Sequence, residues 1–225
     1  SKHIIFYNNI KKIKKGFKLI ISAIKSKDKS DKRSVLHPET IKNLISKGID
    51  IIFESGIGEG IHFDDQTFED LGAKAVSRES CFSDAEIILT PSPIDDHETK
   101  LIAGGKTLMG MVNPFDNLDL IKSLSGSNVN LVSMEFVPRI TRAQKMDVLS
   151  SQANLAGYVA VIESSALLSS AMPMMMTAAG TLKPARVFVI GVGVAGLQAI
   201  ATAKRLGARV EAFDTRDVVE EQVQS

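Results

Sequence analysis

Cysteine is nearly absent from this sequence: Cys81 is the only one among 225 residues. An intrachain disulfide therefore cannot form, and a zinc or iron–sulfur site made of cysteines would lack ligands. No apolar stretch reaches the roughly 18 residues of a membrane-spanning helix; one of the longest is Val187–Gly196. The four histidines lack the paired spacing of a metal site. The sequence thus indicates neither a membrane span nor a catalytic metal.

A strong net charge is also absent, but the value of +1 hides an asymmetry. Residues 1–33 carry eleven lysines and arginines against two acidic residues, whereas the remainder carries sixteen against twenty-four. An acidic body argues against a nucleic-acid partner. We interpret residues 1–16 as a basic, solvated extension; a targeting remnant and a membrane-surface contact are the alternatives.

The remaining composition, 44% apolar and 24% charged, is typical of a globular protein. Short apolar runs alternate with helix-like stretches, which is the rhythm of βαβ units. Within the runs, apolar and polar residues do not strictly alternate, as expected of parallel strands covered on both faces. The predicted strands are Lys18–Ile24, Asp50–Glu54, Glu86–Thr90, Thr107–Val112 and Val129–Ser133. Helices are predicted to begin at Pro38 and to span Gln66–Leu71 and Leu118–Leu124.

A second βαβ unit follows a stretch, residues 141–170, that predicts a long helix. Its parts are a strand at Arg186–Gly191, a helix at Val194–Leu206 and a strand at Arg209–Phe213. We therefore predict the α/β class, with two Rossmann-like, doubly wound parallel-sheet domains joined by a long helix. The second is expected to be truncated, because such a domain needs several more strands. The expected boundaries are residues 1–16 for the extension, 17–138 for the N-terminal domain, 139–170 for the linking loop and helix, and 171–225 for the incomplete domain.

The strongest motif is the G-x-G-x-x-G spacing of Gly191, Gly193 and Gly196 between a predicted strand and a predicted helix. In a dinucleotide-binding turn these glycines allow the tight turn, the approach of a pyrophosphate and close helix packing. Asp214 ends the next strand about 20 residues later, where a carboxylate accepts hydrogen bonds from the adenosine ribose. This pattern favours NAD over NADP, although Arg216 could soften the rejection of a 2′-phosphate.

A second candidate lies between the two predicted domains, where polar residues recur at Arg139, Gln144, Asp147 and Ser150. The last three share one face if the segment is helical. A polar face at an interdomain cleft is a common place for a ligand. A solvated helix face, with an ordinary surface ion pair between Arg139 and Asp147, is the alternative of equal weight from spacing alone.

Three other patterns are interpreted structurally. The methionine-rich run Met172–Met176 is expected to pack in a core or between domains. The acidic pairs Asp64–Asp65 and Asp95–Asp96 are interpreted as solvated turns, and Glu54–Gly58 as a flexible turn, because it lacks the ending of a phosphate loop.

From residue 17 to residue 225 the chain resembles the NAD(H)-binding component of the proton-translocating NAD(P) transhydrogenases, which share their fold with alanine dehydrogenase. The stretches that carry the resemblance are Arg33–Thr40, Val132–Gln144, Leu149–Tyr158, Met176–Arg186 and Gly191–Leu206. The resemblance implies that Arg139, Ile140, Thr141, Gln144, Asp147 and Ser150 hold the nicotinamide end of NAD(H). It also implies that Gly191, Gly193, Val194, Gly196, Asp214, Thr215 and Arg216 line the pyrophosphate and adenosine end.

The activity that the resemblance implies is hydride transfer from NADH bound here to NADP+ on a partner domain, coupled to proton translocation. The implied partners are the NADP(H)-binding domain, a proton-channel membrane domain and a second copy in a homodimer. The chain would then be membrane-associated through other domains and would face the bacterial cytoplasm or an organelle interior. Such transfer needs no protein acid or base, since the cofactors carry the chemistry.

Two rivals remain. Alanine dehydrogenases use a lysine and a histidine after the strands that correspond to Glu86–Thr90 and Thr107–Val112, where this chain has Thr90–Pro93 and Asn113. The other rival is an NAD-sensing or purely structural domain that has lost activity. It is disfavoured by the presence of Arg139, Gln144, Asp147 and Asp214.

Overall fold

The computed structural model describes residues 19–216, which form two compact units that meet between Val137 and Pro138 in the sequence. The predicted extension of residues 1–16 and the predicted strand start at Lys18 lie outside the described residues. Within the described part, no helix has both the length and the apolar character needed to cross a bilayer.

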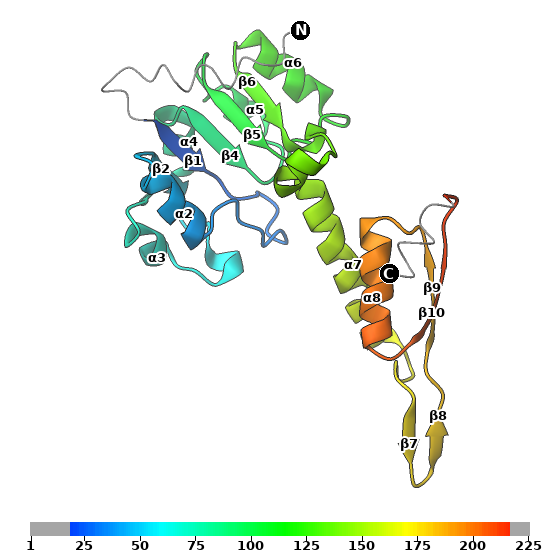
Figure 1. The fold of residues 1–225 in the computed structure, drawn as a ribbon. Helices are drawn as coiled ribbons and strands as arrows, with labels where there is room; N and C mark the ends of the chain where they lie inside the picture. Colours follow the sequence, from blue (N-terminus) through cyan, green and yellow to red (C-terminus); the bar gives the residue numbers. More distant parts are fainter. Residues whose placement is uncertain (1–18, 217–225) are drawn as a thin grey trace. The chain divides into compact units, whose positions relative to one another are not determined.

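The first unit is a six-stranded parallel sheet with helices between its strands (Figure 1). Its elements are β1 (Ile20–Ala23), α2 (Pro38–Ile45), β2 (Asp50–Glu54), α3 (Asp65–Glu69), β3 (Lys74–Val76), α4 (Arg78–Asp84), β4 (Ile87–Thr90), α5 (Asp96–Thr99), β5 (Thr107–Gly110), α6 (Leu118–Gly126) and β6 (Asn130–Ser133). The strand order β3-β2-β1-β4-β5-β6 reverses direction between β1 and β4. This is the doubly wound topology, and the reversal is where such sheets open a crevice at their carboxyl ends.

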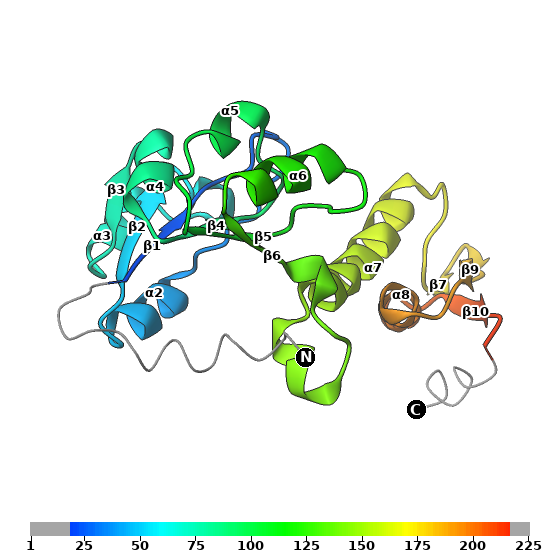
Figure 2. The ribbon, with the colours of Figure 1, turned by 90° about the horizontal axis from the view of Figure 1, so that it is seen from above.

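Two hydrophobic clusters cover the two faces of this sheet. One contains Ile41 of α2 and Phe68 of α3, and the other contains Phe82 of α4 and Leu124 of α6. Figure 2 shows α5 and α6 on the opposite side of the sheet from α2. Burial on both faces explains why the strands lack strict alternation, and it confirms the predicted doubly wound α/β class.

Several short elements of the first unit were not predicted. β3 has three residues and α5 has four, so neither shows a periodic pattern in the sequence. The acidic pairs were interpreted as solvated turns. Asp64, Asp95 and Asp96 are exposed to solvent, but the pairs begin helices rather than form turns. Asp64 and Asp95 are the N-caps of α3 and α5, and Asp65 accepts hydrogen bonds from Ser55 and Gly56. A carboxylate before a helix satisfies N–H groups that otherwise lack a partner.

The second unit contains a parallel pair of strands, two helices and a hairpin (Figure 1). Its elements are a 3-10 segment (Thr141–Met146), α7 (Val148–Leu167), β7 (Met175–Thr177), β8 (Gly180–Leu182), β9 (Arg186–Ile190), α8 (Val194–Arg205) and β10 (Arg209–Phe213). The predicted strands and α8 are present. The long predicted helix is shorter than residues 141–170, because Asp147 caps α7 and the preceding turns are 3-10.

The methionine-rich run divides between core and surface. Met172 is buried beside Val161 of α7 and Ala203 of α8, as predicted. Met174, Met175 and Met176 are exposed within the described residues, the last two in strand β7, so they do not pack in its core; packing between domains stays a prediction for them.

Candidate functional site

Strand β9, the glycine loop and helix α8 form the predicted strand–turn–helix. Gly191 has a φ of +90°, a conformation that other residues rarely adopt, and its N–H donates to the carbonyl of Phe213 on β10 (2.8 Å). Helix α8 begins after Gly193, which contributes no side-chain cap. The first N–H groups of α8 are therefore suited to phosphate oxygens.

The second and third glycines differ in the space around them. A Cβ on Gly196 would lie 1.9 Å from the carbonyl oxygen of Gly191, so only glycine lets α8 pass this close to the loop. A Cβ on Gly193 would meet no atom within 4 Å. Gly196 thus serves the packing of helix against loop, whereas Gly193 leaves an open side at the helix start. This division of roles fits a dinucleotide, whose pyrophosphate approaches the backbone at the second glycine.

Asp214 follows β10, and its carboxylate reaches back to the glycine loop. Oδ2 accepts a hydrogen bond from the Val192 N–H (2.7 Å), and the Arg216 guanidinium donates to both carboxylate oxygens (2.9 Å each). The side-chain bond from Arg216, followed by the backbone bonds from Val192 and Arg216, lowers the pKa of Asp214. The group is therefore an ionised acceptor at neutral pH. The structure brings Asp214 together with the loop that leads into Val194 and α8, and Thr215 follows it directly in the chain.

The segment of residues 139–150 does not form one helical face. Gln144 lies in the 3-10 segment, Asp147 is the N-cap of α7, and Ser150 is in the first turn of that helix. The side chains of Arg139 and Gln144 form no hydrogen bond within residues 19–216, and both are exposed, as are Ile140 and Thr141. These four residues leave their polar and apolar groups available to a ligand.

Asp147 already has partners in the chain. Its Oδ1 accepts from the Ser150 N–H (2.9 Å) and its Oδ2 from the Ser150 hydroxyl (2.6 Å). These two bonds, and after them the nearby charge of Arg139, lower the pKa of Asp147. Asp147 and Ser150 therefore hold the start of α7, whether or not they also contact a ligand.

Helix α7 packs directly against α8. A Cβ on Gly157 would lie 2.1 Å from the carbonyl oxygen of Ala195, and Asn154 donates to the side-chain oxygen of Gln198 (3.2 Å). This contact couples the helix that Asp147 caps to the helix that begins at the glycine loop. No hydrogen bond or ion pair among the described residues joins residues 139–150 to the loop itself.

The first unit contains a cavity of about 820 Å³ that the sequence did not reveal. It lies where the chain leaves β1 and β2, and it is lined by both charge signs, including Lys25, Lys32, Arg33, Glu54 and Glu59. The segment of residues 54–58, predicted to be a flexible turn, forms part of its wall. Gly58 is closely packed there, because a Cβ would lie 2.5 Å from the carbonyl oxygen of Phe63.

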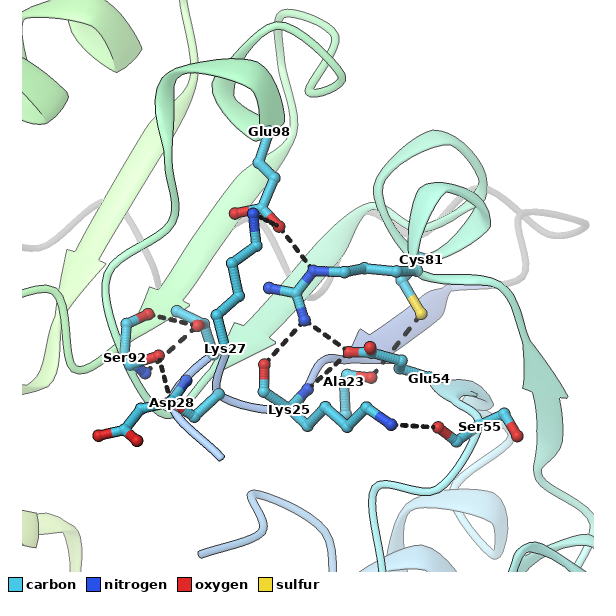
Figure 3. Close-up of polar contacts among 12 residues, drawn as sticks. Ala23, Lys25, Lys27, Asp28, Glu54, Ser55, Cys81, Ser92 and Glu98 are labelled. Atoms are coloured by element: carbon cyan, nitrogen blue, oxygen red, sulfur yellow. Dashed lines mark hydrogen bonds and ion pairs between the residues drawn. The ribbon is translucent and has the colours of Figure 1, made fainter. Parts of the chain in front are cut away.

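Arg78 forms the most buried ion network beside this cavity. Figure 3 labels its partners Lys25, Glu54 and Glu98. Its Nε donates to Glu98 (2.6 Å), and its Nη1 donates to Glu54 (2.7 Å) and to the Lys25 carbonyl (2.8 Å). Burial opposes the ionisation of Glu98, but the bonds from Arg78, the Asp95 N–H and Lys27 outweigh it and lower the pKa of Glu98. Nothing in the local sequence pairs Arg78 with carboxylates twenty or more positions away.

Cys81 lies beside this network but takes no part in it. Its thiol donates to the carbonyl of Ala23 (3.7 Å), and burial raises the pKa of the thiol to about 12. A thiol that stays protonated is a poor nucleophile, so the side chain belongs to the core.

The fold and the second unit together define a class: an α/β protein with the strand, glycine loop, helix and terminal acid of a dinucleotide-binding domain. The sequence comparisons make this more specific. Residues 24–156 match the family model for the alanine dehydrogenase/PNT N-terminal domain, and residues 160–225 match that for the C-terminal domain. The chain belongs to the alanine dehydrogenase/PNT family.

Individual relatives confirm the resemblance to transhydrogenases. The chain is 46% identical over 210 residues to the first part of the NAD(P) transhydrogenase alpha subunit of Rickettsia prowazekii (strain Madrid E), covering 91% of this chain and 55% of the relative. The crystal structure of transhydrogenase from Sinorhizobium meliloti matches with a TM-score of 0.87 and 43% identity, over 91% of this chain and 61% of that one.

Alanine dehydrogenases are more distant. The enzyme of Halomonas elongata (strain ATCC 33173 / DSM 2581 / NBRC 15536 / NCIMB 2198 / 1H9) is 29% identical over 186 residues, covering 81% of this chain and 50% of the relative. The chain therefore spans about half the length of the curated relatives that it matches.

Proposed function

We propose that this chain is the NAD(H)-binding part of a proton-translocating NAD(P)+ transhydrogenase. The observation that carries the proposal is the glycine loop with the ionised Asp214 hydrogen-bonded to the Val192 N–H at its base. The transhydrogenase names of the relatives support it. Partner domains would then supply the NADP(H) site and the proton channel, and would associate the chain with a membrane. A homodimer facing the bacterial cytoplasm or an organelle interior completes the proposal.

The residues of this chain would bind and orient the dinucleotide. The uncapped start of α8 would donate N–H groups to the pyrophosphate, with Gly193 admitting it, and Asp214 would accept hydrogen bonds from the ribose hydroxyls. Arg139 and Gln144 would orient the carboxamide of the nicotinamide. The nicotinamide supplies the hydride chemistry, so positioning accounts for the contribution of the protein.

Alanine dehydrogenase activity is the alternative. The residues that correspond to the lysine and histidine of those enzymes are poorly suited to proton transfer in this chain. Asn113 occupies the position after β5, and its side chain donates to Asp116 (2.8 Å), while its N–H donates to Glu135 (2.6 Å). An amide held in this way cannot exchange a proton with a substrate at neutral pH. The residues at and just after the end of β4, Thr90–Pro93, include no lysine.

The deciding experiment uses the complete native protein in membrane vesicles. NADH is supplied with an oxidised NADP analogue, and in a separate assay NAD is supplied with L-alanine. We expect transfer between the nucleotides, with a rate that responds to an uncoupler. Reduction of NAD that depends on alanine, without transfer between nucleotides, would establish the alternative instead.

Substitutions of Asp147 test whether residues 139–150 contribute to hydride transfer as well as to the stability of helix α7. Asp147→Asn keeps an oxygen for the Ser150 N–H, whereas Asp147→Ala removes the cap and should cost about 1 kcal/mol of unfolding free energy. If Asp147 also contacts the nicotinamide end, both variants should lower hydride transfer, by roughly tenfold or more, since a displaced group costs rate steeply.

The matched control is Asp64→Ala, which removes an equivalent N-cap from α3, where Asp64 accepts from the Thr67 N–H (2.8 Å). It should lower stability by a similar amount and leave the transfer rate unchanged. Unaltered transfer in Asp147→Asn would show that Asp147 serves the helix alone.

A further inference from the structure

The two ends of the proposed dinucleotide site are on different elements of the second unit. The nicotinamide end is assigned to residues 139–150, which lead into α7, and the pyrophosphate end to the glycine loop at the start of α8. No hydrogen bond or ion pair within residues 19–216 joins these two segments directly. Because the two ends of a dinucleotide are covalently joined, the segments that hold them must be correctly spaced. Their spacing therefore depends on how α7 packs against α8.

One face of α7 makes the contact with α8. Nδ2 of Asn154 donates to Oε1 of Gln198 (3.2 Å). Three residues further along α7, a Cβ on Gly157 would lie 2.1 Å from the carbonyl oxygen of Ala195, in the first turn of α8. Ser150 precedes Asn154 by four residues and so lies on the same face of α7. This face thus carries a residue of the proposed nicotinamide end and also meets the helix that begins at the glycine loop.

The amide of Gln198 is held in the orientation that Asn154 needs. Its Nε2 donates to the hydroxyl of Thr202 (3.1 Å), and that hydroxyl donates to the backbone carbonyl of Gln198 (2.8 Å). Thr202 is only 4% exposed, so its side chain is fixed in the core. Because the amide nitrogen of Gln198 is used within α8, its amide oxygen is left for a donor from another element. Asn154 of α7 supplies that donor.

The bond between Asn154 and Gln198 differs in kind from the rest of the packing of α7 on α8. It is the one hydrogen bond between the two helices in the described part of the chain. Further along, the contact is apolar, with Val161 of α7 buried beside Ala203 of α8. Apolar packing has no preferred direction, whereas a hydrogen bond weakens steeply when its distance or angle changes. The amide pair is therefore the part of the contact that best fixes the position of α7 along α8.

We propose that Asn154 and Gln198 are positioning residues for hydride transfer. Their hydrogen bond fixes α7 against α8, and so sets the spacing between the nicotinamide end and the pyrophosphate end of the site. The inference rests on the proposed function of this chain. Neither residue is assigned a contact with the dinucleotide. Loss of their bond should therefore impair the nicotinamide end and leave the contacts at Gly193 and Asp214 intact.

The test compares a ligand that fills one end of the site with a ligand that fills both. ADP-ribose lacks the nicotinamide, whereas NADH carries it. Affinities for both ligands are measured by equilibrium dialysis on the complete native protein. NADPH is present throughout, so that the partner site is filled and no net transfer occurs.

Asn154→Leu keeps the size of the side chain and removes its amide. This variant should bind ADP-ribose as the unsubstituted protein does. It should bind NADH about threefold to tenfold more weakly, the effect of losing about one hydrogen bond at the nicotinamide end. Hydride transfer at saturating nucleotides should fall roughly tenfold, since a small displacement of the reacting groups lowers the rate steeply. If Asn154→Leu lowers the yield of folded protein, Asn154→Ala serves as the second variant, with the same expectation.

A second substitution tests whether the two residues act through their shared bond. Gln198→Met removes the acceptor at a similar side-chain length and should have the same effects as Asn154→Leu. The double variant should be no worse than either single variant, because both substitutions remove the same bond. The matched control is Ser151→Ala, which removes a bond inside α7, from the Ser151 hydroxyl to the Val148 carbonyl (3.0 Å). It should leave both affinities and the transfer rate unchanged.

The outcomes separate this proposal from the proposed function. An equal loss of affinity for ADP-ribose and NADH, an unchanged transfer rate in Asn154→Leu, or losses that add in the double variant would each overturn the positioning role. Transfer by the unsubstituted protein would still uphold the proposed function in those cases. Absence of transfer between nucleotides in the unsubstituted protein would overturn both.

Discussion

Arg78 in the first unit and Arg216 in the second both bind carboxylates, but in different surroundings. The Arg78 side chain is 18% exposed and lies between Glu54 and Glu98, whereas Arg216 is 58% exposed and binds one carboxylate among residues 19–216, that of Asp214. The first arginine links a strand end to two helices, and most of its side chain is out of contact with water. The second can exchange its bonds with a ligand. Burial therefore distinguishes an arginine that holds the fold from one that can take part in recognition.

Removing Arg78 should have the largest effect on the molecule. Arg78→Met leaves Glu54 and Glu98 almost buried without their shared cation, and breaking a buried pair in this way costs about 3–5 kcal/mol. We expect this loss in the unfolding free energy of the first unit, measured by denaturant titration.

Lys122→Gln is the matched control within the same unit. It breaks the pair with Asp119 on α6, where both side chains are well exposed, and should change the unfolding free energy by no more than about 0.5 kcal/mol. Equal effects of the two substitutions would remove the distinction between the buried network and a surface pair.

The sequence was enough to predict the helices and strands whose buried apolar residues follow a recognisable pattern. The strand at residues 50–54 and the helix that follows Gly193 agree with the predictions, and the strand predicted at 107–112 is present but ends at Gly110. Parallel strands and a glycine turn each leave a local pattern in the sequence. The position of Asp214 after β10 was predicted for the same reason.

The features that the sequence did not predict depend on contacts between residues distant in sequence or on hydrogen bonds of side chains. Arg78 meets Glu54 and Glu98 only because β2, α4 and α5 converge, and no spacing rule links these positions. Asp147 was predicted on a helical face, yet it caps the helix, since its side chain bonds Ser150 and the preceding turns are 3-10. A short polar side chain near a helix start competes with the backbone, and local periodicity does not decide the outcome.

The glycine loop offers a second comparison, between packing and ligand access. Gly196→Ala places a Cβ against the carbonyl of Gly191 and should destabilise the second unit by about 1–3 kcal/mol, as overpacking does. Gly193→Ala meets open space and has an ordinary φ of −85°, so it should leave stability nearly unchanged while weakening NADH binding. Thermal unfolding and an NADH titration of each variant would measure the two effects separately. A Gly193→Ala protein that binds NADH normally would contradict the proposed approach of the pyrophosphate.

The smallest expected effect concerns the exposed end of the Arg78 network, where Lys27 bonds Asp95. The bond from Lys27, followed by the Glu98 N–H, lowers the pKa of Asp95 from its ordinary 3.8 to about 2. A carboxyl whose pKa is lowered on folding contributes stability above pH 4, and that contribution is lost as the pH falls toward 2. Because the Asp95 side chain is 49% exposed, solvent screening limits the contribution of the pair to less than about 1 kcal/mol.

Lys27→Gln should therefore lower the unfolding free energy slightly at pH 6, and the difference from the unsubstituted protein should shrink as the pH approaches 2.5. Denaturant titrations at several pH values would measure it, with Lys122→Gln as the control for loss of a surface lysine. A difference that does not change with pH would mean that Lys27 stabilises the unit through packing or through Glu98, whose carboxylate it also approaches (3.0 Å), rather than through the charge of Asp95. Since Arg78 already holds Glu98 from the buried side, the pH-dependent result is the one that the geometry supports.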